Sequence, residues 1–253
     1  MPSGRKLHVI PIPFAGEVKP GDDLAEKLAA ALKHQKLELR SRDILVVKHK
    51  IVAKAEGRIF DLRSVRPSPP ALAWARLSGG DPRVTELALR ESRRIVRQKH
   101  GVLITETRHG FVCANSGVDV SNVDGGQSAV LLPKDPDHSA ARLRSRLKKL
   151  SGVDIAVIVS DSFGRPWRQG LTEVAIGVAG MKPLLDYRGR RDEHGYELHA
   201  TAEAVADEIA CAAGLVCGKL NRTPASIVRG LRFANARASA RELIRPAKDD
   251  LFR

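Results

Sequence analysis

Apolar and polar residues alternate along the chain in two periods, which predict strands and helices in an interspersed order. Short, mainly apolar runs predict strands over residues 7–12, 44–47, 155–159 and 227–228. Apolar residues at helical spacing predict amphipathic helices that begin at Leu24 and that cover residues 138–150 and 202–217. Asp22 and Asp23 directly precede the first of these helices and are typical of a helix cap.

Residues between 48 and 115 combine helix, turn and strand signals. Residues 48–58 have a β-like pattern that polar and charged side chains interrupt, and function is common at such interruptions. A Pro-rich turn at residues 67–70 precedes a helix that extends to Leu77, and residues 83–97 predict a second helix with a basic exposed side. The β-rich runs 101–107 and 110–115 predict an antiparallel hairpin, because only Arg108 and His109 separate them.

Together these elements predict an α+β fold, in which mixed or antiparallel sheets with a long β-hairpin are flanked by helices. The hairpin and the lack of regular βαβ spacing argue against a doubly wound sheet. A Gly-rich, charged region at residues 163–197 has weaker signals, and we expect the tail beyond Asn235 to be helical at best. We predict a single domain over residues 1–253, with two interwoven subdomains as the alternative.

Composition is that of an ordinary globular protein, with 43% hydrophobic residues for a core and 28% charged residues for the surface. No window approaches the roughly 18 apolar residues of a membrane helix. The N-terminal residues lack the apolar region and cleavage site of a secretory signal, so we expect a cytoplasmic protein without a membrane partner. Cys113, Cys211 and Cys217 lack CxxC spacing, which favours buried thiols over a disulfide framework or a zinc site.

A formal charge of +14 indicates negatively charged partners, because such a surface concentrates anions. Nucleic acid is the usual first hypothesis for this balance. The basic residues are scattered, however, aromatic residues make up only 4%, and no nucleic-acid-binding motif is present. Small molecules that carry phosphates and carboxylates satisfy the same electrostatics, and we expect these rather than nucleic acid.

Phosphate binding would need residues outside the familiar loops, since neither a Walker A loop nor a GxGxxG motif is present. Lys48, His49, Lys50 and Lys54 lie within seven residues, and lysine ammonium groups bind phosphate as compact charges. The alternative interpretation is a solvated basic strand end.

Two aspartates lie in loops that are rich in hydroxyl and amide groups and follow predicted strands. Asp119 and Asp161 offer the oxygen ligands that Mg²⁺ and Mn²⁺ prefer, and would leave coordination positions open for nucleotide phosphates. Each could instead cap a turn or a helix. Glu56 is a third candidate carboxylate, with a surface strand position as the alternative.

Residues 163–170 combine Arg165, Trp167 and Arg168 with glycines, which could hold a carboxylate or phosphate and stack on a planar ring. A loop packed on its own tryptophan is the competing interpretation. The histidines lack ligand spacing, and no serine or cysteine stands in a GxSxG motif, so a histidine metal centre and a nucleophile elbow have little support.

Several motifs, in order and at matching spacing, resemble the coenzyme F420:L-glutamate ligase family, the gamma-glutamyl ligases of deazaflavin coenzyme biosynthesis. They extend across roughly residues 7–232. The matching segments are residues 21–24, 50–58, 113–123, 161–168, 175–180, 186–189, 201–210 and 228–230.

The resemblance implies a GDP-forming acid–amino-acid ligase that adds L-glutamate to the precursor of coenzyme F420 through an amide bond. GTP would phosphorylate the precursor's terminal carboxylate to an acyl phosphate, which the glutamate amine attacks. Mg²⁺ or Mn²⁺, with two ions expected, would assist, and K⁺ is a further candidate. The resemblance also implies an intertwined homodimer. Some relatives carry a nitroreductase-like domain after the ligase; this chain stops where that domain would begin, so we expect no flavin-dependent reduction.

Matching motifs also imply roles for individual residues. Asp119 and Asp161 would hold the first metal ion, Ser162 would contribute to the second, and Lys54 would join the two aspartates as a catalytic residue. Nucleotide contacts would come from Ala15, Gly16, Glu17, Val18, His49, Lys50, Lys54, Asn122, Gly218 and Lys219. Ser162 stands where threonine is common and keeps the hydroxyl. Residues 219–224 depart from the family's glycine-rich pattern, which leaves guanine specificity and the remaining ligand of the second metal open.

Two other functions stay open at this point. One is a basic nucleic-acid-binding protein, for which the net charge is the sole motive. The other is a homologue that binds the deazaflavin without ligation, against which the intact Asp119 and Asp161 argue.

Overall fold

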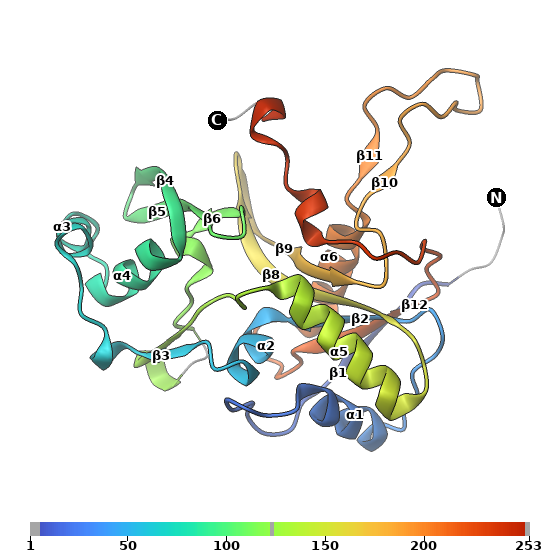
Figure 1. The fold of residues 1–253 in the computed structure, drawn as a ribbon, viewed down its shortest axis with the longest axis horizontal. Helices are drawn as coiled ribbons and strands as arrows, with labels where there is room; N and C mark the ends of the chain where they lie inside the picture. Colours follow the sequence, from blue (N-terminus) through green and yellow to red (C-terminus); the bar gives the residue numbers. More distant parts are fainter. Residues whose placement is uncertain (1–5, 122–123, 251–253) are drawn as a thin grey trace.

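A five-stranded mixed sheet forms the centre of the computed structural model, which describes residues 6–121 and 124–250. Its strands lie in the order β1-β12-β2-β8-β9 (Figure 1), and they are β1 (His8–Ile12), β12 (Ala225–Arg229), β2 (Ile44–Lys48), β8 (Ala156–Arg165) and β9 (Arg168–Ala179). β2 and β8 pair in parallel, whereas the other neighbouring strands of this sheet are antiparallel. The predicted α+β class with mixed sheets and a long hairpin is confirmed.

Successive side chains along each strand point to opposite faces of this sheet, so the hydrophobic core is divided between the two faces. Leu45 and Val47 pack with helices α1 (Leu24–His34) and α5 (Pro136–Ser151) on one face. Ile44 and Val46 pack with α6 (Val205–Cys217) on the other. Figure 1 shows α1 and α5 side by side. The sheet is therefore buried on both faces, which fits its near-continuous apolar strands.

Helix ends follow the sequence signals. The Asp23 carboxylate accepts hydrogen bonds from the backbone N–H groups of Ala25 and Glu26, which confirms the predicted cap. Asp135 caps α5 in the same way, and Gly152 ends that helix in the left-handed conformation.

A second group of elements lies beside the central sheet (Figure 1) and packs around its own apolar cluster. Its helices are α3 (Pro69–Ser78) and α4 (Pro82–Glu91), and its strands are β3 (Ile59–Asp61), β4 (Ser92–Lys99), β5 (Val102–Thr107), β6 (Val112–Ala114) and β7 (Ser128–Val130). β5 and β6 pair antiparallel, as predicted. The short strands β10 (Leu185–Asp186) and β11 (Ala202–Glu203) begin a hairpin that projects from the body of the molecule.

The prediction of one helix over residues 83–97 is wrong. Helix α4 ends at Glu91, and the chain continues as the edge strand β4. The β-branched pair Ile95 and Val96 favours a strand, and an ion pair between Arg94 and Glu106 joins β4 to β5. The pattern of one segment contains no information on its pairing with another strand. Here that pairing outweighs the helical spacing of the apolar residues.

Three further boundaries differ from the sequence prediction. Residues 49–55, expected to be β-like, form helix α2 (His49–Ala55), in which His49, Ile51, Val52 and Ala53 are buried. Strand β8 continues to Arg165 rather than ending near residue 159. Helix α6 begins at Val205, since Ala202 and Glu203 pair with β10.

The tail forms two short 3₁₀ segments, η4 (Ala240–Leu243) and η5 (Ala247–Asp249), as expected of a segment that is helical at best. In the part of the chain that the structure describes, no helix has both the length and the apolar character needed to cross a bilayer.

Candidate active site

A cleft of about 1080 Å³ opens where β2 passes into α2. Segments that are distant in sequence line it: residues 14 and 16–18, the β2–α2 junction, residues 119–121 and 124–126, the middle of β8, Leu171 of β9, and the loop after α6. The lining includes Lys48, His49, Lys50, Lys54, Asp119, Asp161, Ser162 and Lys219.

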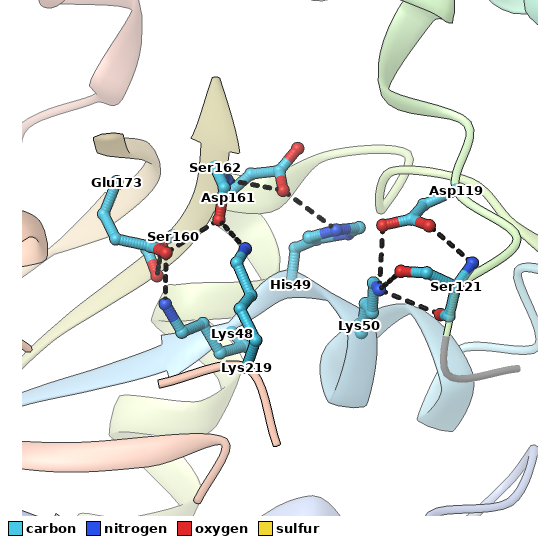
Figure 2. Close-up of polar contacts among 10 residues, drawn as sticks. All are labelled: Lys48, His49, Lys50, Asp119, Ser121, Ser160, Asp161, Ser162, Glu173 and Lys219. Carbon is cyan, nitrogen blue, oxygen red and sulfur yellow. Dashed lines mark hydrogen bonds and ion pairs between the residues drawn. The ribbon is translucent and has the colours of Figure 1, made fainter. Parts of the chain in front are cut away.

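The β2–α2 junction directs consecutive side chains to different partners (Figure 2). His49 is buried, and its Nε2 lies 3.2 Å from Oδ1 of Asp161. The Nζ of Lys50 lies 2.8 Å from Oδ2 of Asp119 and donates to the hydroxyl and carbonyl oxygens of Ser121. Lys54 follows Lys50 by one helical turn and also lines the cleft.

Asp161 extends from the middle of β8. Its Oδ1 accepts the backbone N–H of Ser162 at 2.7 Å in addition to the contact with His49, whereas Oδ2 accepts no hydrogen bond from the residues that the structure describes. Burial opposes ionisation of Asp161, but the attraction and hydrogen bond of His49 and the Ser162 N–H outweigh it, so the pKa of Asp161 lies below its ordinary value. The charge of Asp119 acts on that pKa in the opposite direction, which places the two carboxylates within electrostatic range.

Asp119 is fixed by its backbone, which exchanges two hydrogen bonds with Val130 of β7. The turn before it needs a glycine: Gly117 has a φ of +72°, and a Cβ there would lie 2.8 Å from Cγ of Leu132. Burial opposes ionisation of Asp119, but hydrogen bonds from Lys50 and Ser121 hold the pKa of this carboxyl below its ordinary value. Both aspartates are thus anionic at neutral pH.

Glu173 on β9 was missed by the sequence analysis, although it organises one side of the site. Its Oε1 lies 2.5 Å from Nζ of Lys48, and it accepts hydrogen bonds from the hydroxyls of Ser160 and Ser162. The Nζ of Lys219 in turn donates to Oγ of Ser162 at 2.5 Å. Glu173 is the one acidic residue of β9 and directly precedes its apolar second half, residues 174–179, which was the available signal.

Sheet register explains this arrangement. Lys48 pairs with Ser160 across β2 and β8, and Ser162 pairs with Glu173 across β8 and β9. Ser160 and Ser162 lie two residues apart, so they share a face of β8, whereas Asp161 between them points to the other face. Alternation of side chains along β8 therefore places Ser160 and Ser162 on the side of Glu173, and Asp161 on the side of His49.

Most of the predicted site residues come together. Those that line the cleft are Gly16, Glu17, Val18, His49, Lys50, Lys54, Asp119, Asp161, Ser162, Gly218 and Lys219. Ala15 is adjacent to this lining but is not part of it. Asn122 lies outside the described residues.

Two weaker candidates lie elsewhere. Glu56 accepts a hydrogen bond from the hydroxyl of Ser139 at 2.6 Å and does not line the cleft, so it is not a third carboxylate of this site. Arg165 and Arg168 lie at the exposed turn of the β8–β9 hairpin, outside the lining. Trp167 has 80% of its surface exposed, which contradicts a loop packed on its own tryptophan.

The donor set fits a divalent ion that shares its coordination with a ligand. Among the described residues, no three or more His, Cys, Asp or Glu side chains form a group able to hold a metal ion. Asp119 and Asp161 supply anionic oxygens to the same cleft, and hard ions of the Mg²⁺ type keep several non-protein ligands in phosphate sites. The two carboxylates could therefore bind such an ion together with phosphate oxygens.

Comparison with known proteins places this cleft in a family. The sequence profile of the F420-0:Gamma-glutamyl ligases matches residues 14–230, and thus all the segments that line the cleft. The chain belongs to this family. A protein from Methanopyrus kandleri, named coenzyme F420:L-glutamate ligase, is 47% identical over 98% of both chains. Proteins of the same name from Methanothermobacter thermautotrophicus and Methanocaldococcus jannaschii are 46% and 43% identical over 93% and 83% of this chain and cover 94% and 84% of their own lengths.

Membership in the gamma-glutamyl ligase family confirms the resemblance drawn from the ordered motifs. It also agrees with the α+β architecture, whose several sheets and flanking helices bring residues from distant segments of the chain to one cleft.

Proposed function

We propose that this protein is a GTP-dependent ligase that joins L-glutamate to the terminal carboxylate of the coenzyme F420 precursor, with formation of GDP. The observation that carries the proposal is the meeting of Asp119 and Asp161 in one cleft that four lysines also line. The names of the relatives support the choice of substrates.

Amide formation from a carboxylate requires activation, because the leaving group would otherwise be an oxide ion. The carboxylate oxygen attacks the γ-phosphorus of GTP and displaces GDP, which gives an acyl phosphate. The amine of glutamate then attacks the acyl carbon, inorganic phosphate departs, and the amine loses a proton. A cleft that holds the triphosphate and excludes bulk water protects the acyl phosphate from hydrolysis.

The cationic residues orient the nucleotide in this proposal. Lys48, Lys54 and Lys219 line the cleft and would contact phosphate oxygens, while Lys50 holds Asp119 and Ser121 in place. A bound Mg²⁺ or Mn²⁺ on Asp119 and Asp161 would neutralise charge that develops on the transferred phosphoryl group. His49 positions Asp161 through its contact with Oδ1.

The test is product analysis. The protein is incubated with GTP, Mn²⁺, L-glutamate and the precursor, and release of GDP and phosphate is measured with and without glutamate. We expect glutamate-dependent release and a product whose mass has increased by one or more glutamyl units. Absence of release with any nucleoside triphosphate would count decisively against ligation.

We extend the proposal to a cytoplasmic homodimer. The edge strand β4 supports an interface between copies, since Ile95 and Val96 have 44% and 38% of their surfaces exposed. Light scattering after gel filtration would give twice the chain mass for a dimer, and the single chain mass would exclude it.

A further inference from the structure

Ser162 lies at the centre of a charged cluster on the α6 side of β8, which we define as Lys48, Ser160, Ser162, Glu173 and Lys219 (Figure 2). Asp161, its neighbour in sequence, points away from this cluster toward His49. The cluster lines the cleft through its two lysines and two serines, and Glu173 lies behind them.

The hydroxyl of Ser162 is already engaged with two charged groups. It donates its proton to Oε1 of Glu173 at 2.7 Å and accepts a proton from Nζ of Lys219. A hydroxyl oxygen has two lone pairs, so one remains. A divalent ion bound there would share this oxygen with an ammonium group, and the two like charges would repel at close range.

Glu173 does not relieve that repulsion. Its Oε1 serves both Lys48 and Ser162, and its Oε2 accepts from Ser160. Only 9% of the Glu173 side chain is exposed, so its oxygens are directed at these partners. Two ammonium groups and one carboxylate give the cluster a net charge of +1, which suits a phosphate oxygen and disfavours a second dication.

We propose that the ammonium group of Lys219 takes the place of a second divalent ion, so that the nucleotide is bound with one divalent ion, on Asp119 and Asp161, and with the Lys219 charge at Ser162. This inference rests on the proposed function, because it assigns the means by which the same site neutralises the triphosphate. It departs from the two ions that the family resemblance implies.

The test counts bound Mn²⁺. The intact protein is titrated with Mn²⁺ in the presence of a non-hydrolysable GTP analogue, and in parallel without nucleotide, and free Mn²⁺ is read from its electron paramagnetic resonance signal. We expect one Mn²⁺ per chain for the natural protein. In Lys219→Gln, which removes the charge and offers an amide oxygen, we expect a second Mn²⁺ that binds at least tenfold more tightly than any further ion does in the natural protein.

Two control variants separate charge from general disturbance. Lys219→Arg keeps a cation beside Ser162 and should bind one ion. Lys148→Gln changes a lysine that pairs with Asp154 on the surface, and should behave as the natural protein does. Circular dichroism checks that each variant folds.

Two ions of similar affinity in the natural protein would overturn the inference, as would a count in Lys219→Gln that stays at one. The proposed function is tested separately, by measurement of glutamate-dependent release of GDP. One bound ion without ligation would refute the function and leave the inference, whereas two ions with ligation would do the opposite.

Discussion

Replacement of Glu173 by glutamine should destabilise the protein far more than the loss of a surface charge would. The carboxylate is the shared acceptor for Lys48, Ser160 and Ser162. Glutamine keeps the shape and one acceptor oxygen but removes the charge. The ammonium group of Lys48, whose side chain is only 19% exposed, then lacks its counter-charge.

The magnitude follows from burial of the pair. Removal of one partner of a buried ion pair costs about 3–5 kcal/mol. Lys48 keeps some solvent contact, and the glutamine oxygen can still accept from a serine hydroxyl, so we expect about 2–3 kcal/mol for Glu173→Gln. With a urea m-value of about 3 kcal/mol per molar, the unfolding midpoint should fall by about 1 M.

Urea unfolding, monitored by circular dichroism, measures the effect in a double-mutant cycle. Lys48→Met combined with Glu173→Gln removes both charges, so the double variant should recover about 2 kcal/mol relative to the sum of the single variants. Glu26→Gln, which disrupts an exposed pair with Arg146, is the control and should cost less than about 1 kcal/mol. Simple additivity in the cycle would refute the view that Lys48 and Glu173 act as a pair.

Three other outcomes follow from the site and its surroundings. Asp161→Asn should reduce turnover at least about a thousandfold without loss of folding, because it removes a charge from the proposed metal site, and Asp154→Asn on the surface should not; retained activity would remove Asp161 from the mechanism. Gly214→Ala in α6 should destabilise the protein, because the new Cβ would lie 2.6 Å from Cγ of Glu173. Within a helix alanine is ordinarily favoured over glycine by about 1 kcal/mol, so an unfolding midpoint that rises would contradict this contact. Burial and the charge of Asp161 raise the pKa of Cys113 to about 12, so in the folded protein this thiol should resist alkylation at pH 8 and react only after denaturation, as mass mapping of the labelled peptide would show.

The fold was predictable where one periodicity dominates a segment. The helices after Asp23 and Asp135 have caps and apolar stripes that identify them without tertiary information. Prediction failed at residues 83–97, where apolar residues suit a helix in isolation and only pairing of β4 with β5 favours a strand. The prediction for residues 49–55 also failed, because His49 has a polar side chain and yet is buried in the structure.

The candidate site shows a similar division. Asp119 and Asp161 could be selected from the sequence because short polar residues surround each of them after a predicted strand, and both line the cleft. Glu173 could not be selected in the same way. Its importance arises from cross-strand neighbours on β8, whose register includes a shift between Val159 and Ser160 that no local pattern reveals.

Side-chain alternation along β8 gives the cleft two chemically different sides. Along β8, the carboxylate of Asp161 faces His49 and the α1–α5 side, whereas Ser160 and Ser162 face Glu173 and α6. A single strand therefore presents a carboxylate on one side and, on the other, two hydroxyls, of which that of Ser162 accepts a hydrogen bond from Lys219. Because a one-residue slip in register would exchange these sides, the pairing of β8 with β2 and β9 determines which charge faces each part of the cleft.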